Sequence, residues 1–239
     1  MKLFDALIGS IDQDAPIRGV LAGVHWTAVS SRVCGMASTV MEDKPHGEGK
    51  IRDAGELEKK TALELAHYVY SENTLEASIG FAALNSLIVP PLSELVEINA
   101  FKYLVGRGAG KHVAIFGHFP YLDELRSSAS QLTVFELAPV AGEHHLNEAP
   151  KLLPVADIVA ITSNSLINHT LVEILPHIKT NAFIALVGPT TPLSPVLFDY
   201  GIHMLSGVQI VNEDALYLSV SQAAIFRQMR GVKQVTWIA

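Results

Sequence analysis

From Lys111 onward, stretches typical of β-strands alternate with stretches typical of α-helices. Helical segments separate the strands, and in the clearest of them, residues 166–177, Ile167, Leu171 and Leu175 share one face. Such alternation is the pattern of a parallel sheet with crossover helices. We therefore expect a Rossmann-like parallel sheet with flanking helices. The predicted strands are 112–117, 132–137, 157–162, 182–188, 205–211 and 233–238.

The chain before Lys111 has a different pattern. Residues 17–40 are predicted to form two strands, since apolar side chains from Val20 to Ala28 alternate along one face. An amphipathic helix is expected at 55–70, and the helix at 75–88 is apolar on every side, which predicts that it is buried. We expect a small α+β domain at residues 1–105 and the Rossmann-like domain at 106–239.

Two further features mark the expected boundary. Asn99 is predicted to cap a short helix that ends near Gly106. The glycine-rich stretch at 106–111 is then expected to connect the two domains.

Composition and charge argue against several classes of partner and location. The formal net charge is −7 and Lys and Arg form no cluster, so we expect no nucleic-acid partner. Prolines interrupt the uncharged stretches at 77–93 and 180–198, so no membrane span is expected. Cys34 is the single cysteine, which favours a reducing compartment. Asp5 is an acidic residue too early for a signal peptide, and we expect a cytoplasmic protein.

Three predicted loops follow strands at the edge where open parallel sheets bind ligands. Their backbone N–H groups and hydroxyls suit a polar or anionic small molecule. The alternative is that they are ordinary strand-to-helix turns with no ligand. The candidate ligand-binding residues in these loops are Gly117, Phe119, Pro120, Thr162, Ser163, Asn164, Gly188, Pro189, Thr190 and Thr191.

An acidic residue after the first of these loops bears on dinucleotide binding. Glu136 lies 19 positions after Gly117 (136 − 117), close to the spacing at which a carboxylate holds a ribose hydroxyl. The loop at 117–120, however, contains one glycine where a pyrophosphate site needs several. The sequence therefore argues against NAD and leaves a nucleoside-like ligand, or a fused heterocycle stacked near Phe119, as alternatives.

Histidines, serines and the cysteine are the other candidate reactive groups. His144 and His145 are the candidate metal ligands, beside Glu143 and Glu148, but no metal-binding spacing such as H-E-x-x-H occurs. Solvated loop histidines are the alternative. The serines at 163 and 165 lack the G-x-S-x-G pattern of a nucleophile, and Cys34 falls within a predicted strand, which favours an inert thiol.

Several segments of the chain form a set of motifs: Gly117–Pro120, Phe135–Leu137, Ala156–Thr162, Leu166–Leu171 and Gly188–Pro195, with Gly23–Thr27 and Ala77–Asn85 in the first domain. Taken together, these segments resemble those of a heavy-metal chelation family. The resemblance covers nearly the whole chain. It implies an enolase-N-terminal-like domain followed by a Rossmann-like domain, with the site between them. It further implies condensation or hydrolysis of pterins, flavins or siderophore-like chelators.

The sequence departs from the family pattern at residues 163–165. The serine, asparagine and serine there stand where the family usually has glycine and threonines. Their side chains are expected to narrow the pocket.

The resemblance and the residue patterns together point to one shared pocket. If the buried helix at 75–88 abuts the strand ends, the Asn85 amide would complete a pocket floored by Thr162, Asn168 and Thr190. His118 and Glu136 are the candidates for proton transfer. Asn85, His118 and Glu136 are thus the predicted catalytic residues, although His118 could simply hydrogen-bond its own turn.

The leading prediction is an enzyme that acts by acid–base chemistry on such a heterocycle or chelator at the domain interface. The first alternative is a non-catalytic protein that binds a metal or metallophore. The second is a methyltransferase-like domain that binds S-adenosylmethionine, which Glu136 favours and the missing glycines oppose. The sequence allows a homo-oligomer and does not decide whether the loop at 41–55 closes over the site.

Overall fold

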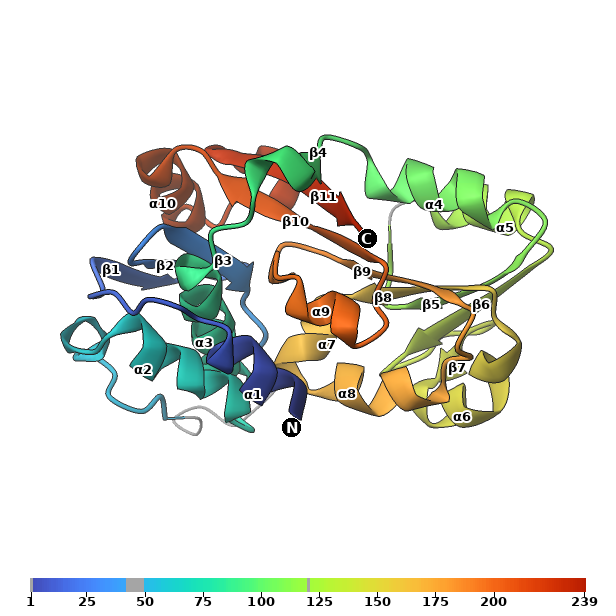
Figure 1. Cartoon of the computed structure of the whole chain (residues 1–239), viewed down its shortest axis with the longest axis horizontal. Coiled ribbons are helices and arrows are strands. Elements are labelled where there is room, and N and C mark those ends of the chain that lie inside the picture. The colour runs from blue at the N-terminus through green and yellow to red at the C-terminus, as the bar shows by residue number, and fades with distance from the viewer. Residues whose placement is uncertain (1, 42–49, 120) are drawn as a thin grey trace.

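The computed structural model describes residues 2–41, 50–119 and 121–239. Its strands form a three-stranded antiparallel sheet and an eight-stranded, mainly parallel sheet (Figure 1). The smaller sheet lies at one end of the molecule beside α2 and α3, and the larger sheet extends through the rest (Figure 1). The predicted α/β fold with a Rossmann-like parallel sheet is confirmed.

The N-terminal part begins with α1 (Lys2–Gly9) and the strands β1 (Gly19–Ala22), β2 (Trp26–Ser30) and β3 (Cys34–Ser38). The prediction of two strands over 17–40 is wrong, because the chain reverses between β1 and β2. The N–H of Gly23 donates to the carbonyl of Trp26, which closes a hairpin at this point. Val24 was expected on the buried face and instead lies at the turn, 55% exposed.

The predicted helix at 55–70 is divided into three pieces: the 3-10 helix η1 (Leu57–Lys59), α2 (Ala62–Ala66) and the 3-10 helix η2 (His67–Tyr70). Thr61 starts α2 there, because its side chain and that of Glu64 form a reciprocal capping box. The next helix, α3 (Thr74–Leu87), is buried on nearly every side, as its composition predicted.

The strands of the larger sheet lie in the order β4-β11-β10-β9-β8-β5-β6-β7. Strands β5 to β10 run parallel to one another, whereas β11 pairs antiparallel with both β10 and β4. All six strands predicted after Lys111 are present. The bounds are β4 (Leu95–Val96), β5 (His112–Phe116), β6 (Gln131–Glu136), β7 (His144–His145), β8 (Ile158–Thr162), β9 (Phe183–Val187), β10 (Met204–Ile210) and β11 (Val232–Ile238).

The chain changes direction across this sheet between β5 and β8. From β5 it passes to β6 on one side and then returns to β8 on the other side. A crevice forms beyond the carboxyl ends of two such strands, because their crossover helices lie on opposite faces of the sheet. The fold therefore places the expected ligand edge next to the loops that follow β5 and β8.

Helices cover both faces of the parallel strands (Figure 1). On β5, Val113 and Ile115 pack toward α4 and α5, whereas Ala114 and Phe116 pack into the core on the other face. The helices are α4 (Ala100–Gly108), α5 (Leu122–Ser128), α6 (Ala149–Leu152), α7 (Asn164–Ile167), α8 (Thr170–Ile174), α9 (Val196–Asp199) and α10 (Glu213–Ser221), with 3-10 helices η3 (Leu92–Glu94), η4 (Leu146–Glu148), η5 (Leu153–Val155), η6 (Leu175–His177) and η7 (Phe226–Gln228).

The junction between the two parts of the chain is closely packed. Strand β4 pairs with β11 and α4 contacts α5, so residues 95–108 lie with the larger sheet. Helix α4 is capped by Asn99 as predicted, but it continues to Gly108 through part of the expected connector. One core cluster contains Phe4 and Phe81 from the first part together with residues of the larger sheet. The domain division at 105/106 stays a prediction.

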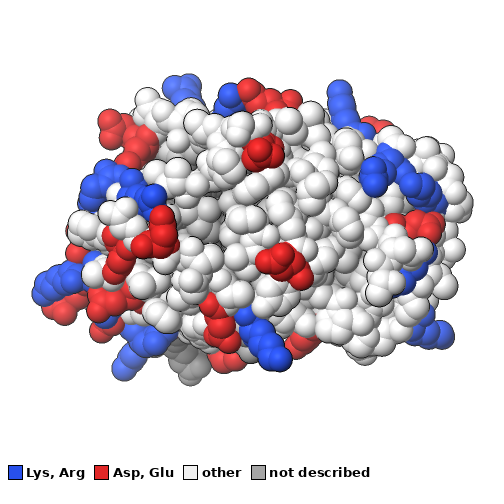
Figure 2. Space-filling model, viewed as in Figure 1, with Lys and Arg blue, Asp and Glu red and all other residues white. Residues whose placement is uncertain are grey.

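Surface and helix composition bear on the expected partners. Among the described residues, no helix has both the length and the apolar character needed to cross a membrane. Lys and Arg are scattered around the outline of the face in Figure 2, whose middle is largely uncharged. The absence of a nucleic-acid partner stays a prediction.

The close contact of β3 with α3 can be tested at Gly35. A Cβ atom at this position would lie 2.2 Å from the Ala82 carbonyl oxygen and 2.3 Å from the Ser86 nitrogen. Gly35→Ala should therefore lower the free energy of unfolding by about 1–3 kcal/mol, measured by urea denaturation. Gly106→Ala is the matched control, because nothing lies within 4 Å of its Cβ position and alanine favours the helix by about 0.5–1 kcal/mol. Equal effects of the two substitutions would contradict the packing.

Candidate functional site

A cavity of about 460 Å³ lies beyond the carboxyl ends of β5, β8 and β9. All three predicted loops contribute to its wall, through Phe119, Ser163 and Gly188 among others. Trp26 and Ser38 of the smaller sheet also line it, together with residues of α4, β10 and β11. The cavity therefore lies between the two sheets and at the point where the strand order of the larger sheet reverses, which is where α/β sheets bind ligands.

Two glycines allow these loops to approach one another. Gly117 after β5 has a φ of 99° and Gly188 after β9 has a φ of 139°, values that favour glycine. A Cβ atom at Gly188 would lie 2.3 Å from the Ser163 hydroxyl oxygen. Glycine is therefore required for the loop after β9 to contact the loop after β8.

Thr190 joins the loop after β9 to both sheets. Its N–H donates to the Ser163 hydroxyl at 3.2 Å, and its hydroxyl accepts a hydrogen bond from the Ser38 N–H at 2.9 Å. Its carbonyl accepts from the Asn85 side-chain amide at 3.1 Å. Thr190 has no exposed surface. Every hydrogen-bonding group of this residue is thus used to hold β3, α3 and the loop after β8 together.

His118 lies between two carboxylates on the wall of the cavity. Its Nδ1 is 2.9 Å from Glu136 Oε1, and its Nε2 is 2.6 Å from Glu143 Oε1. The hydrogen bond to Glu143 and the negative charges of both carboxylates raise the pKa of His118 above its usual value, against the opposing effect of desolvation. The pKa of Glu143 is lowered by the N–H of Val140 and by His118. This geometry favours a positively charged imidazole.

The predicted site residues divide into groups in the structure. Of the described residues, those that line the cavity include His118, Phe119, Thr162, Ser163, Asn164, Gly188 and Pro189. Gly117 and Glu136 are not among the described lining residues, although Glu136 contacts His118, which is. Pro120 and residues 42–49 of the loop at 41–55 lie outside the described residues. The catalytic and ligand-binding roles of all these residues stay predictions.

The expected pocket shared by Asn85, Thr162, Asn168 and Thr190 is not formed among the described residues. The Asn85 side chain donates a hydrogen bond to the Thr190 carbonyl, but Asn85 and Thr191 line a different cavity. The Asn168 side chain accepts hydrogen bonds from the N–H and hydroxyl of Thr170, at the start of α8. Thr190 is fully buried beneath the loop. The shared pocket is not formed because the polar groups of Thr190 and Asn168 are hydrogen-bonded to other residues of the protein.

The two candidate metal ligands are used in local structure. Nδ1 of His144 lies 3.2 Å from Glu148 Oε2, and Nδ1 of His145 accepts the Asn147 N–H at the start of η4. In the described part of the chain, no group of three or more His, Cys, Asp or Glu side chains is placed to hold a metal ion. The residues there do not fit a metal bound directly by protein side chains.

The sequence patterns missed several residues at the cavity. Glu143 is predicted only as a neighbour of the candidate metal ligands, because its local sequence gives no sign that it reaches His118. Trp26 and Ser38 come from strands distant in the chain, and Phe101, Arg227 and Gln234 come from segments that suggested no chemistry. Only the fold brings them together.

The fold and the cavity define an α/β protein with a ligand-sized site at the switch point of a parallel sheet. Two family models, both described as "Putative heavy-metal chelation", match residues 4–88 and 99–238. The chain belongs to this family, as the sequence motifs indicated.

Comparison with known proteins supports the family and its fold. A crystal structure from the DUF364 family of Desulfitobacterium hafniense, of unknown function, is similar with a TM-score of 0.87 and 28% identity, over 100% of this chain and 98% of that one. A Pyrococcus horikoshii structure from the same family has a TM-score of 0.82 at 19% identity, with the same coverage, and shows the same fold. An uncharacterized protein of Methanocaldococcus jannaschii is 28% identical over 81% of this chain and 77% of its own length.

The role of Thr190 can be tested by Thr190→Val, which keeps the shape of the side chain. The substitution leaves the buried N–H of Ser38 without its acceptor, and we expect the free energy of unfolding to fall by about 1–3 kcal/mol. Thr180→Val is the matched control on an exposed position and should change stability by less than about 0.5 kcal/mol. Denaturation with urea measures both, and a Thr190→Val protein as stable as the control would contradict the role.

The charge on His118 can be tested by NMR titration of its imidazole. The pKa should lie above that of a free histidine, about 6.5, and should fall in Glu143→Gln. Because the folded-state pKa is raised, the stabilisation from this contact is present below about pH 6.5 and is lost as the pH rises through the raised pKa. An ordinary pKa in the unmodified protein, or no change in Glu143→Gln, would exclude the proposed pairing.

Proposed function

We propose that this chain is an enzyme that binds a pterin-, flavin- or siderophore-like molecule in the cavity and transfers a proton to it from His118. The observation that carries the proposal is the placement of His118 on the wall of the cavity, with a carboxylate at each ring nitrogen. The hydrogen bond to Glu143 and the charges of both carboxylates raise the pKa of His118, which favours a protonated imidazole that can give its proton to a bound molecule.

The lining of the cavity suits a planar ring system. Phe101 and Phe119 lie with their ring centroids 5.1 Å apart, and Trp26 and Phe226 lie 5.7 Å apart. All four side chains line the cavity, and flat heterocycles stack on such surfaces. Asn164 and Gln234 could hydrogen-bond polar ring edges, and the exposed guanidinium of Arg227 would attract an acidic group.

Proton transfer requires His118 to release one of its two contacts. One ring nitrogen would leave its carboxylate and donate its proton to the departing atom of the bound molecule, while the other carboxylate keeps the ring oriented. The His118 side chain is 56% exposed, so it has room to turn. In hydrolysis, water attacks the carbon, the bond to the leaving atom breaks, and the proton from His118 makes that atom neutral; the neutral imidazole then takes the proton that the attacking water loses. In condensation, the attacking group of the second reactant loses this proton instead of water.

The second candidate is binding of a metallophore without turnover. The absence of a preformed metal-ligand group among the described residues favours delivery of a metal inside a chelator, which the aromatic cavity would hold. An S-adenosylmethionine site has less support, because Glu136, the candidate ribose ligand, is paired with His118. We propose a cytoplasmic location for either activity.

The proposal predicts different effects of one variant on binding and on turnover. The melting temperature should rise with one compound among a pterin, riboflavin, 2,3-dihydroxybenzoate and S-adenosylmethionine, since ligand at about 100 times its Kd stabilises by about 2.7 kcal/mol. His118→Gln should keep this shift and lower turnover of the same compound by a factor of about 10²–10⁴. His177→Gln, at an exposed histidine outside the cavity, is the matched control and should keep both.

The outcomes separate the candidates. Binding that survives in His118→Gln, with no chemical change of the ligand in either protein, supports the metallophore-binding alternative. Loss of turnover to the same degree in His177→Gln would mean that His118 has no special role.

A further inference from the structure

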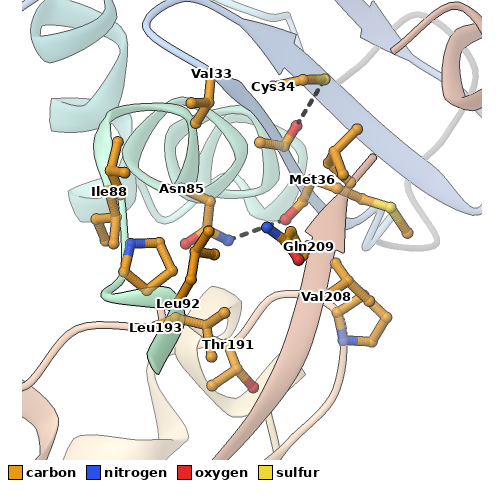
Figure 3. Close-up of a pocket in the computed structure, with 15 residues that line it drawn as sticks. Val33, Cys34, Met36, Asn85, Ile88, Leu92, Thr191, Leu193, Val208 and Gln209 are labelled. Carbon is orange, nitrogen blue, oxygen red and sulfur yellow. Dashed lines mark hydrogen bonds between the residues drawn. The ribbon is translucent and has the colours of Figure 1, made fainter. Parts of the chain in front are cut away.

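A second cavity, of about 210 Å³, lies between β3, the end of α3 and the end of β10 (Figure 3). Its lining shares only Pro189 and Val208 with the larger cavity among the residues described. Asn85 reaches into it from α3, with Thr191 on the opposite side and Gln209 beside it on β10 (Figure 3). It is therefore a separate space on the other side of the loop that follows β9.

The lining of this second cavity is apolar and uncharged. Most of its surface comes from aliphatic side chains, for example Ile88, Leu193 and Ile210. No Lys, Arg, His, Asp or Glu occurs among its described lining residues. Burial raises the pKa of the Cys34 thiol to about 12, so this residue is also neutral. Such a surface favours a neutral ligand, because a charged one would lose its hydration without gaining a partner.

Two buried polar atoms in this lining have no hydrogen-bond partner within the described residues: Asn85 Oδ1 and Thr191 Oγ1. The orientation of the Asn85 amide is fixed, because its Nδ2 donates to the carbonyls of Met36 and Thr190, at 3.0 and 3.1 Å. The oxygen must therefore be the atom left without a partner. Thr191 is 3% exposed, so bulk water does not hydrate its hydroxyl.

We propose that this cavity is a second ligand site, which takes a neutral, mainly apolar molecule that donates an N–H or O–H hydrogen bond to Asn85 Oδ1. A cavity of about 150 Å³ in another protein accommodates benzene, so this larger one has room for about one bicyclic ring. Val89 and Leu92, 54% and 66% exposed, give the opening an apolar rim through which such a molecule can enter. Thr191 Oγ1 accepts from or donates to the same molecule.

Indole and benzofuran are a matched pair of probes for this site. They have nearly the same shape, but indole carries an N–H donor where benzofuran carries an oxygen. In NMR titrations of the full chain, indole should shift the signals of Asn85, Thr191 and Leu193. It should bind about threefold to tenfold more tightly than benzofuran, the factor expected for one additional neutral hydrogen bond.

Two variants distinguish the site from unspecific binding. Asn85→Leu removes the acceptor and should make the two probes bind with equal affinity. Val33→Trp places a ring on the wall of the cavity and should abolish binding of both, which keeps the test decisive if Asn85→Leu does not fold. Val24→Trp, at an exposed turn outside the cavity, is the matched control and should bind both probes as the unmodified protein does.

Three results would overturn the proposal: no signal shifts with millimolar indole, equal affinity of the two probes in the unmodified protein, or shifts confined to Phe119 and Ser163 in the larger cavity. None of these results bears on His118, which lines only the larger of the two cavities among the described residues. A failure here is therefore distinguishable from a failure of the proposed function.

Discussion

The three hydrogen bonds of Thr190 are the contact on which the rest of the structure depends. They connect the loop after β9 to β3, to α3 and to the loop after β8. Thr190 has no exposed surface, and an unpaired polar group in such a buried place lowers the free energy of unfolding by about 1–3 kcal/mol. The smaller sheet is thereby held in one position against the carboxyl edge of the larger sheet.

Both cavities follow from this position of the loop. On one side of Pro189, the three strand-end loops, Trp26 and Ser38 enclose the larger cavity with His118 in its wall. On the other side, Asn85 and Thr191 line the smaller, uncharged cavity. Neither cavity supplies a group of three or more His, Cys, Asp or Glu side chains placed to hold a metal ion, among the described residues.

The sequence predicted what depends on local pattern. The predicted bounds of β5 to β11, except β7, which was not predicted, agree with the structure within about two residues. Buried parallel strands are continuous apolar runs, which makes them visible in the sequence. The hairpin turn at Gly23 was not predicted, because it depends on packing against α10, a segment distant in the sequence. A Cβ atom added to Gly23 would lie 2.7 Å from the Val220 side chain of α10. The sequence predicted a pocket shared by Asn85 and Thr190. In the structure the Asn85 amide nitrogen donates to the Thr190 backbone carbonyl, and the side-chain oxygen of Asn85 is left without a partner beside the second cavity. The position of the Glu143 carboxylate beside His118 depends on the direction of the preceding turn, which no local sequence pattern predicts.

Amide hydrogen exchange on the folded protein tests the central claim, that Thr190 holds the two sheets together. The N–H of Ser38 donates to Thr190 across the junction, and the N–H of Thr190 donates to Ser163 on the larger-sheet side. Both N–H groups should exchange as slowly as that of Val113 in the central strand β5, because both are buried and hydrogen-bonded. If they instead exchange as fast as the exposed turn residue Ala141, the junction opens freely and neither cavity has a fixed wall.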